Sequence, residues 1–349
     1  MATGLSSKRI LLLMDTLRTT EPEAMELVLR EEGYREDRQL KRTLETLGHE
    51  VFAFGLGDSI EDLLRVVRRV RPDIVFNQCE AFAGDRSLEP QVAGLFDLLG
   101  LPYTGASPRC LELCADKGLT KKILSYHRVR VPAFAVSTAR RPMRRSGGLR
   151  FPVIVKPLEF EASEGIAQSS FASNWEEARA RVEYLHGKFG CDVILEEYVE
   201  GRELYVSLLA EARPQVFALR ELVFGAWPEG KPRIATYQAK WNDDYRKKWG
   251  IRSDYARSLD PKVEQRILQV GKKIASLFEL RGPARVDLRL TEEGEIVFLE
   301  ANPNPCLYRG EDFASAAERS GLDYPALLDR ILQQAWRRRR PLPAILRVA

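Results

Sequence analysis

Residues 284–302 read Ala-Arg-Val-Asp-Leu-Arg-Leu-Thr-Glu-Glu-Gly-Glu-Ile-Val-Phe-Leu-Glu-Ala-Asn. Two segments in which apolar and polar residues are mixed, 284–290 and 295–302, flank a short acidic turn that ends in glycine at 294. Segments of this length around a Glu-Gly turn are typical of a β-hairpin. Charged residues recur at every second position of the first segment, which places them on one face of that strand.

The polar residues of this hairpin are predicted to meet. Arg285, Asp287 and Arg289 share one face of the first strand, while Phe298, Glu300 and Asn302 share one face of the second. If the tight turn sets the register, the two polar faces coincide. Two carboxylates and a carboxamide are the oxygen ligands that Mg2+ takes when phosphates fill its other positions. The alternative is an ordinary amphipathic hairpin whose charged face is solvated.

The N-terminal part of the chain alternates between strands and helices. Strands are expected at 9–15, 50–54, 73–78 and 101–105, with helices at 36–47, from 59, and at 88–99. Gly48 and Gly100 follow two of these helices, as C-terminal glycines commonly do. This order predicts a doubly wound parallel sheet over residues 1–105.

Beyond residue 118 the pattern changes to a mixed α+β type. A basic loop is expected at 137–150. A helix is expected to begin after Asn174, because Glu177 three residues later completes a capping pattern. A long helix should start at Asp260-Pro261. Further strands are expected at 152–156, 192–198, 203–210, 216–222 and 233–238. We therefore expect three domains, at 1–117, 118–212 and 213–349.

Composition excludes several classes of protein. The 349 residues carry 54 Lys plus Arg against 50 Asp plus Glu, so the net charge of +4 does not indicate a nucleic-acid or membrane-surface partner. The five cysteines form no CxxC pair and the three histidines no HxxxH pair, which makes a zinc site or a Cys-His nucleophile improbable. The first residues have no apolar signal-peptide core, so a cytoplasmic location is expected.

Three lysines are singled out by their position, and one of them, Lys156, suits a phosphate. Lys156 ends the apolar run Phe-Pro-Val-Ile-Val-Lys, where a cation needs a partner. Lys117 follows Asp116 and Lys240 follows Gln238-Ala239. Each alone also fits a surface lysine. The segment 240–255 is rich in aromatics and cations. It is predicted to be a lid if the site must keep a reactive intermediate from water, and the alternative is a solvated loop.

Together these elements resemble the ATP-grasp superfamily, and within it the D-alanine–D-alanine ligase group. The resemblance extends from about residue 98 to 334 and is specific in the order and spacing of its motifs. It rests on Gly-Leu-Pro-Tyr-Thr-Gly (100–105), Asp116-Lys117, Pro-Val-Ile-Val-Lys-Pro (152–157), Glu-Glu-Tyr-Val (196–199), Glu203, Ala239-Lys240, Ala-Arg-Val-Asp (284–287) and Leu-Glu-Ala-Asn-Pro (299–303).

The resemblance implies a three-domain ATP-grasp architecture and a role for each matched residue. Lys117 and Lys156 should hold the ATP α- and β-phosphates, and Lys240 the γ-phosphate. Arg285 should stabilise charge on an acyl phosphate and the tetrahedral intermediate, so Arg285 and Lys240 are the expected catalytic residues. The rest of the nucleotide site is expected at Ser163, Glu196, Glu197, Val199 and Glu203. The expected Mg2+ ligands, which also suit Mn2+, are Asp287, Glu300 and Asn302.

The chain departs from the ligase pattern where substrates bind. The family's glycine-rich element after the first strand is absent, its lid tyrosine is Trp241, and its serine and apolar residue at the second substrate are Glu311 and Asp312. Acidic groups there favour a cation or a neutral polar group over a carboxylate, so D-alanine is not the expected substrate. The expected substrate residues are Glu80, Trp241, Cys306, Glu311 and Asp312.

The expected function is therefore an ATP-dependent carboxylate–amine ligase that forms an amide through an acyl phosphate and releases ADP and phosphate. Its partners would be small amino-acid-like carboxylates and amines, and a homodimer is possible by analogy with the group. The alternatives are an ATP-grasp kinase that phosphorylates a hydroxyl and a nucleotide-binding regulator without turnover. A kinase would need no amine to complete its reaction.

Overall fold

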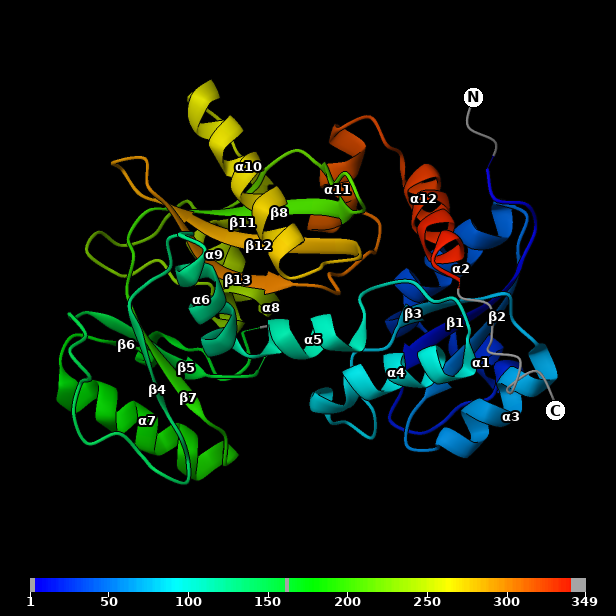
Figure 1. Ribbon diagram of the computed structural model, residues 1–349, viewed down its shortest axis with the longest axis horizontal. Helices are drawn as coiled ribbons and strands as arrows, with labels where there is room; N and C mark the ends of the chain where they lie inside the picture. Colours follow the sequence, from blue (N-terminus) through cyan, green and yellow to red (C-terminus); the bar gives the residue numbers. More distant parts are fainter. Residues whose placement is uncertain (1–3, 161–162, 340–349) are drawn as a thin grey trace.

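A computed structural model describes residues 4–160 and 163–339, which form three β-sheets and their covering helices (Figure 1). The first sheet is parallel, with strand order β2-β1-β3. Its strands are β1 (Arg9–Asp15), β2 (Glu50–Leu56) and β3 (Ile74–Gln78). The predicted strand at 101–105 is reduced to a single parallel bridge between Val75 and Tyr103.

Helices cover both faces of this sheet, which confirms the doubly wound arrangement. One face packs against α2 (Arg35–Thr46) and α12 (Tyr324–Arg337), and the other against α3 (Ile60–Val70) and α4 (Glu89–Leu99). Helix α1 (Pro22–Val28) follows β1. The Gly100 that ends α4 has a φ of 62°, a left-handed conformation that glycine adopts without strain.

The last helix differs from the predicted domain division. Leu328 and Leu332 of α12 lie in the same buried core as Ile10 and Leu12 of β1. A domain that ends at residue 117 would leave the part of this face that α12 covers exposed. The N-terminal unit therefore includes a helix from the predicted C-terminal domain.

The second sheet is the largest and carries the hairpin. Its order is β11-β10-β8-β12-β13, and β9 also pairs with β8. Its strands are β8 (Arg202–Ala210), β9 (Gln215–Val216), β10 (Arg220–Phe224), β11 (Ile251–Tyr255), β12 (Gly282–Leu290) and β13 (Ile296–Asn302). Residues of α5 (Pro108–Ala115), α6 (Lys117–Tyr126) and α10 (Pro261–Leu277) share its apolar core.

Strand β8 lies before the predicted boundary at 212 but pairs with strands that follow it. The sequence placed 203–210 in the module that ends at 212, but β8 hydrogen-bonds along its whole length to β12. From Glu203 to Ala210 every residue of β8 is buried, as expected of a central strand. The large sheet therefore begins before residue 212, at Arg202.

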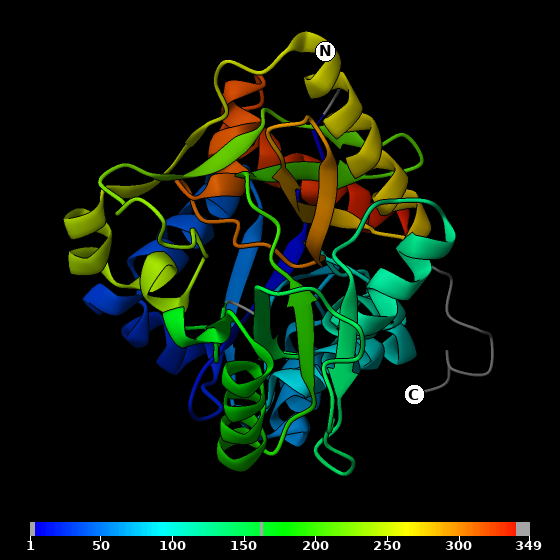
Figure 2. The ribbon, with the colours of Figure 1, turned by 90° about the vertical axis from the view of Figure 1, so that its left-hand side faces the viewer.

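The third sheet is small and antiparallel throughout, with order β4-β7-β5-β6. It contains β4 (Phe134–Ser137), β5 (Val153–Pro157), β6 (Phe171–Ala172) and β7 (Val193–Glu197). Helix α7 (Trp175–Phe189) packs on one face, and the Asn174 side chain caps it by accepting a hydrogen bond from the Glu177 amide. This module lies below the large sheet in both views (Figures 1 and 2).

The segment before the predicted lid is not the strand expected at 233–238. The Thr236 hydroxyl accepts a hydrogen bond from the Ala239 amide at 3.2 Å and caps α8 (Tyr237–Trp241), so the chain turns into a helix. The predicted lid continues as α9 (Asp243–Trp249) and the edge strand β11. Helix α11 (Asp312–Arg319) precedes α12. Among the described helices, none is both long enough and apolar enough to span a membrane.

Candidate active site

The hairpin β12–β13 brings its polar residues together in the predicted register. Arg285 lies opposite Asn302 and Asp287 opposite Glu300. The register shifts after Asp287, which is a β-bulge. This bulge corrects one expectation, because it places Phe298 opposite Leu288 in the apolar core rather than on the polar face with Glu300.

The two carboxylates of the hairpin differ in their partners. Arg285 donates to both oxygens of Asp287, at 2.7 and 2.9 Å. Burial raises the pKa of Asp287, and Glu300 adds to that effect. Burial also opposes ionisation of Glu300, but the nearby cations, Lys240 foremost, lower its pKa to about 2. A metal cation that binds here would therefore meet an ionised Glu300 carboxylate.

The donor set of this hairpin fits a magnesium ion. Asp287, Glu300 and Asn302 offer hard oxygen atoms, and a carboxylate has lone pairs left after a bidentate arginine contact. Within the described ranges no three His, Cys, Asp or Glu side chains form a cluster that could hold a metal ion.

A buried ion-pair cluster lies behind the hairpin. Lys156 on β5 lies 3.0 Å from Oε2 of Glu196, and Lys121 on α6 lies 2.8 Å from Oε1. Burial would raise the pKa of Glu196, but the two lysines lower it. Burial lowers the pKa of Lys121 to about 8 despite this contact. Lys121 also donates to the carbonyl of Leu299, next to Glu300, at 2.7 Å.

A cavity of about 80 Å³ separates the small sheet from the large one. It collects side chains from β5 and β7 on one side and from β12 and β13 on the other. The predicted site residues that line it are Lys156, Ser163, Glu196, Glu197, Val199, Glu203, Lys240, Asp287 and Glu300. At one end Arg289 donates to Glu203 at 2.9 Å, and the Tyr205 hydroxyl donates to the same carboxylate at 3.1 Å.

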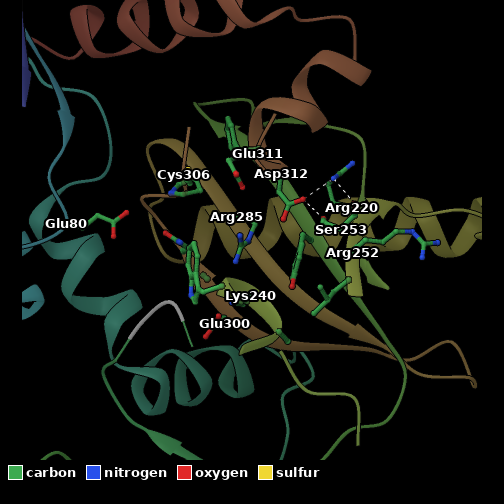
Figure 3. Close-up of a pocket in the computed structure, with 18 of the residues that line it drawn as sticks. Glu80, Arg220, Lys240, Arg252, Ser253, Arg285, Glu300, Cys306, Glu311 and Asp312 are labelled. Carbon is green, nitrogen blue, oxygen red and sulfur yellow. Dashed lines mark hydrogen bonds and ion pairs between the residues drawn. The ribbon is translucent and has the colours of Figure 1, made fainter. Parts of the chain in front are cut away.

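A larger cavity of about 390 Å³ adjoins the first and shares Lys240 and Glu300 with it (Figure 3). Among the residues labelled in Figure 3, Arg285 lies near the middle of the cavity. Glu80 faces it from the N-terminal unit, and Glu311 faces it from the start of α11. The predicted site residues that line it are Glu80, Lys117, Lys240, Trp241, Arg285, Glu300, Asn302, Cys306, Glu311 and Asp312. All predicted site residues thus line one of the two adjoining cavities.

The acidic pair at the start of α11 is not uniform. Asp312 accepts a hydrogen bond from Arg220 Nε at 3.0 Å and another from the Ser253 hydroxyl (Figure 3). Its charge is therefore met inside the protein. The expectation that both acids repel a substrate carboxylate applies to Glu311 alone.

The predicted lid covers the site only in part. Tyr245 and Trp249 pack against Trp227, with ring centroids 6.4 and 5.5 Å away, instead of over the larger cavity. Trp241 does line that cavity and is 59% exposed. Arg246 of α9 also lines it.

Three functional residues escaped the sequence interpretation. Lys121 lies four residues after Lys117 on the same helix, a spacing that signals a shared face. Arg289 was placed on the polar face but was given no partner. Arg220 directly follows the apolar run 216–219 (Val-Phe-Ala-Leu) and is only 8% exposed, so an arginine at the end of such a run was the available signal.

The sequence matches a described protein family over most of the site. Residues 115–333 match the family described as D-ala D-ala ligase C-terminus. A D-alanine–D-alanine ligase of Aquifex aeolicus is 27% identical over 304 residues, covering 87% of this chain and 95% of that protein. An uncharacterized protein of Sinorhizobium fredii is 29% identical over 313 residues, covering 84% of this chain and 85% of its own.

Solved structures show the same fold. The D-alanine–D-alanine ligase of Bacillus anthracis superimposes with a TM-score of 0.74 at 20% identity, covering 95% of this chain and 99% of that one. The VanG D-Ala:D-Ser ligase of Enterococcus faecalis gives 0.68 at 20% identity, covering 95% and 100%. The family match covers more than half of the chain and every hairpin residue described above, so this protein belongs to the D-alanine–D-alanine ligase family of ATP-grasp enzymes.

Proposed function

We propose that this protein is an ATP-dependent carboxylate–amine ligase that releases ADP and phosphate and does not use D-alanine as its preferred substrate. The carrying observation is that the two adjoining cavities share Lys240 and Glu300. A phosphoryl group that leaves a nucleotide in the smaller cavity would thus meet a carboxylate held in the larger one. Positioning and charge neutralisation are the main demands of such a transfer.

In this proposal the cation-rich wall handles the phosphates. Lys117, Lys156 and Lys240 neutralise the charge of the triphosphate, and their combined effect on the Glu300 pKa supports this role. The segment 196–199, at the end of β7 and just after it, faces the base, and Glu203 faces the ribose. Ser163 and Glu197 complete the wall of the smaller cavity.

Magnesium would be held by Asp287, Glu300 and Asn302, where it would neutralise charge on the transferring phosphoryl group. Arg285 would then hold the oxygen that becomes negative when an amine adds to the acyl phosphate. Its contact with Asp287 keeps the guanidinium in place before any substrate arrives.

The substrate proposal rests on the walls of the larger cavity. Glu80, Trp241, Cys306 and Glu311 line it together with the Arg220–Asp312 pair. Burial raises the pKa of Cys306 to about 12, so its thiol is neutral and acts only through shape and polarity. A cavity with these groups suits small polar carboxylates and amines.

A coupled ADP and phosphate assay over a matrix of carboxylates and amines tests the proposal. We expect ADP and phosphate in equal amounts, dependent on both a carboxylate and an amine. ADP without phosphate, together with a phosphorylated hydroxyl compound, would show a kinase instead. The D287N variant should lose activity by more than about 100-fold, whereas E293Q, in the exposed turn of the same hairpin, should keep it.

A further inference from the structure

Four carboxylates line the larger cavity, and three of them are already engaged. Glu80 lies 2.8 Å from Arg86, Asp312 lies 3.0 Å from Arg220, and Glu300 is surrounded by lysines. Glu311 is different, because no ion pair or side-chain hydrogen bond joins it to any residue in the described part of the chain. An ionisable group left without a partner in a substrate cavity is available to a ligand.

The backbone of Glu311 is fixed while its side chain is not used. Its amide donates to the Tyr308 carbonyl at 3.1 Å, and its carbonyl accepts from the Ser315 amide at 2.9 Å. It is the N-cap residue of α11, where a carboxylate commonly accepts a backbone N–H, yet its side chain makes no cap hydrogen bond. The carboxylate instead points from the start of α11 toward Arg285 (Figure 3).

The surroundings of Glu311 raise the pKa of its carboxyl group. Burial raises its pKa, and Asp312 on the same helix and Glu36 on α2 raise it further. Arg246 on α9 and Arg220 on β10 act in the opposite direction. A carboxylate with a raised pKa accepts a proton more readily near neutral pH than an ordinary surface glutamate does.

We propose that Glu311 binds the ammonium form of the acceptor amine and removes one proton from it before the amine attacks the acyl phosphate. This inference rests on the proposed ligase function and names its acceptor as a primary amine that enters protonated. An ammonium ion has no lone pair and cannot attack a carbonyl, so the site needs a proton acceptor. The pKa of Arg285 is held above its usual range by Asp287 despite its burial, so its guanidinium stays protonated and cannot serve as one.

Proton removal comes before amide formation. One N–H bond of the ammonium breaks and its proton moves to a Glu311 oxygen, which frees the nitrogen lone pair. The nitrogen then forms a bond to the acyl carbon, and the carbon–oxygen bond to phosphate breaks. The second proton leaves the nitrogen with the departing phosphate, and Glu311 later returns its proton to solvent.

Hydroxylamine separates proton removal from all other steps, because it is a nucleophile that is mostly unprotonated at neutral pH. Wild type, E311Q, E311D and the control E318Q, on the exposed side of the same helix, would first be given ATP, Mg2+ and a panel of L- and D-amino acids with hydroxylamine. Hydroxamate formation identifies the carboxylate. With that carboxylate, ammonium chloride, glycine, D-alanine and ethylenediamine are then compared as acceptors.

We expect E311Q to lower kcat/KM for the best amine by about 100-fold or more at neutral pH. Its hydroxamate rate should stay within about threefold of wild type. The amine deficit should shrink as the pH rises and the free amine accumulates, E311D should recover part of the rate, and E318Q should match wild type.

Three results would overturn the inference. One is an unchanged amine rate in E311Q, and another is an equal loss with amine and hydroxylamine, which would mean a structural role. The third is hydroxamate formation by a wild type that uses none of the protonated amines, which would leave the ligase proposal intact. If no carboxylate supports ADP formation at all, the proposed function itself fails, and this inference with it.

Discussion

At the scale of single residues, Lys156 combines a buried ion pair with a place in the nucleotide cavity. Its ammonium lies 3.0 Å from Glu196, and its side chain is 9% exposed. Lys156→Ala removes a cation from the predicted phosphate site, so we expect turnover to fall by at least about 100-fold. Steady-state kinetics checks this, with thermal unfolding as a test of the fold. Activity within about tenfold of the parent, or about 1.4 kcal/mol of barrier, would refute the assignment, and Lys188→Ala on the outer face of α7 is the matched control.

Lys121 gives a prediction about pH. Its pKa falls to about 8 in the folded protein because it is buried, against about 10.4 in an unfolded chain. Between these values the unfolded state binds more protons, so this group makes the folded state more stable as the pH rises. The Tm of wild type minus that of Lys121→Met should therefore increase from pH 7 toward pH 10. A difference that is flat or falls over this range would contradict the burial effect.

The residues of the site were predictable where a motif carried them, and not where only packing does. Asp287, Glu300 and Asn302 follow from strand alternation and a short turn. Lys121 has no motif of its own, and its importance comes from the side chain of Glu196 and the carbonyl of Leu299, which lie on distant segments. Contacts of that kind depend on how the sheets meet, which local periodicity does not encode.

At the scale of elements, the close approach of α10 to β8 depends on Gly271. A Cβ atom at this position would lie 2.7 Å from Cγ1 of Val206. Gly271→Ala should therefore destabilise the protein by about 1–3 kcal/mol through overpacking. Denaturant unfolding measures the change.

Gly187 in α7 is the matched control for this substitution. A Cβ atom there would meet nothing within 4 Å. Gly187→Ala should be stabilising by about 0.5–1 kcal/mol, because alanine favours the helix. Equal effects of the two substitutions would contradict the packing of α10 on the sheet.

Some helices and strands could be predicted from the sequence pattern, and others could not. Most of the helix–strand alternation before residue 105 was recovered, because its strands are short apolar runs and because Ser59 and Gly100 mark a helix start and a helix end. The β-bulge after Asp287 and the turn of 233–238 into α8 were missed. A bulge adds one residue without changing composition, and Thr236 caps a helix only once its side chain is placed.

At the scale of the whole molecule, the first and last parts of the chain share one core. Leu328 of α12 is fully buried beside residues of β1 and β2. Leu328→Ala should lower the free energy of unfolding by about 2–5 kcal/mol. It should lower the unfolding midpoint of the N-terminal sheet together with that of the rest of the protein. Leu98→Ala, at a position that is 75% exposed, should change stability by less than about 0.5 kcal/mol. If L328A were as stable as the wild type, this would contradict the packing of α12 in the core of the N-terminal sheet.

The sheets to which β8 and α12 belong could not be predicted from the sequence for the same reason. Local composition marks where a segment changes type, but β8 and α12 join sheets through partners far away in the chain. The overall ATP-grasp architecture was predictable, because its motifs recur in a fixed order. The membership of single elements was not.

The central claim is that ATP activates a carboxylate by phosphoryl transfer, and oxygen-isotope transfer measures this most directly. The carboxylate found by hydroxamate formation is labelled with 18O in its carboxyl group and turned over with ATP and an amine, and the released phosphate is analysed by mass spectrometry. An acyl phosphate leaves one carboxyl oxygen on phosphorus, so we predict phosphate that carries a single 18O atom. Phosphate without label would contradict carboxylate activation and the account of the site built on it.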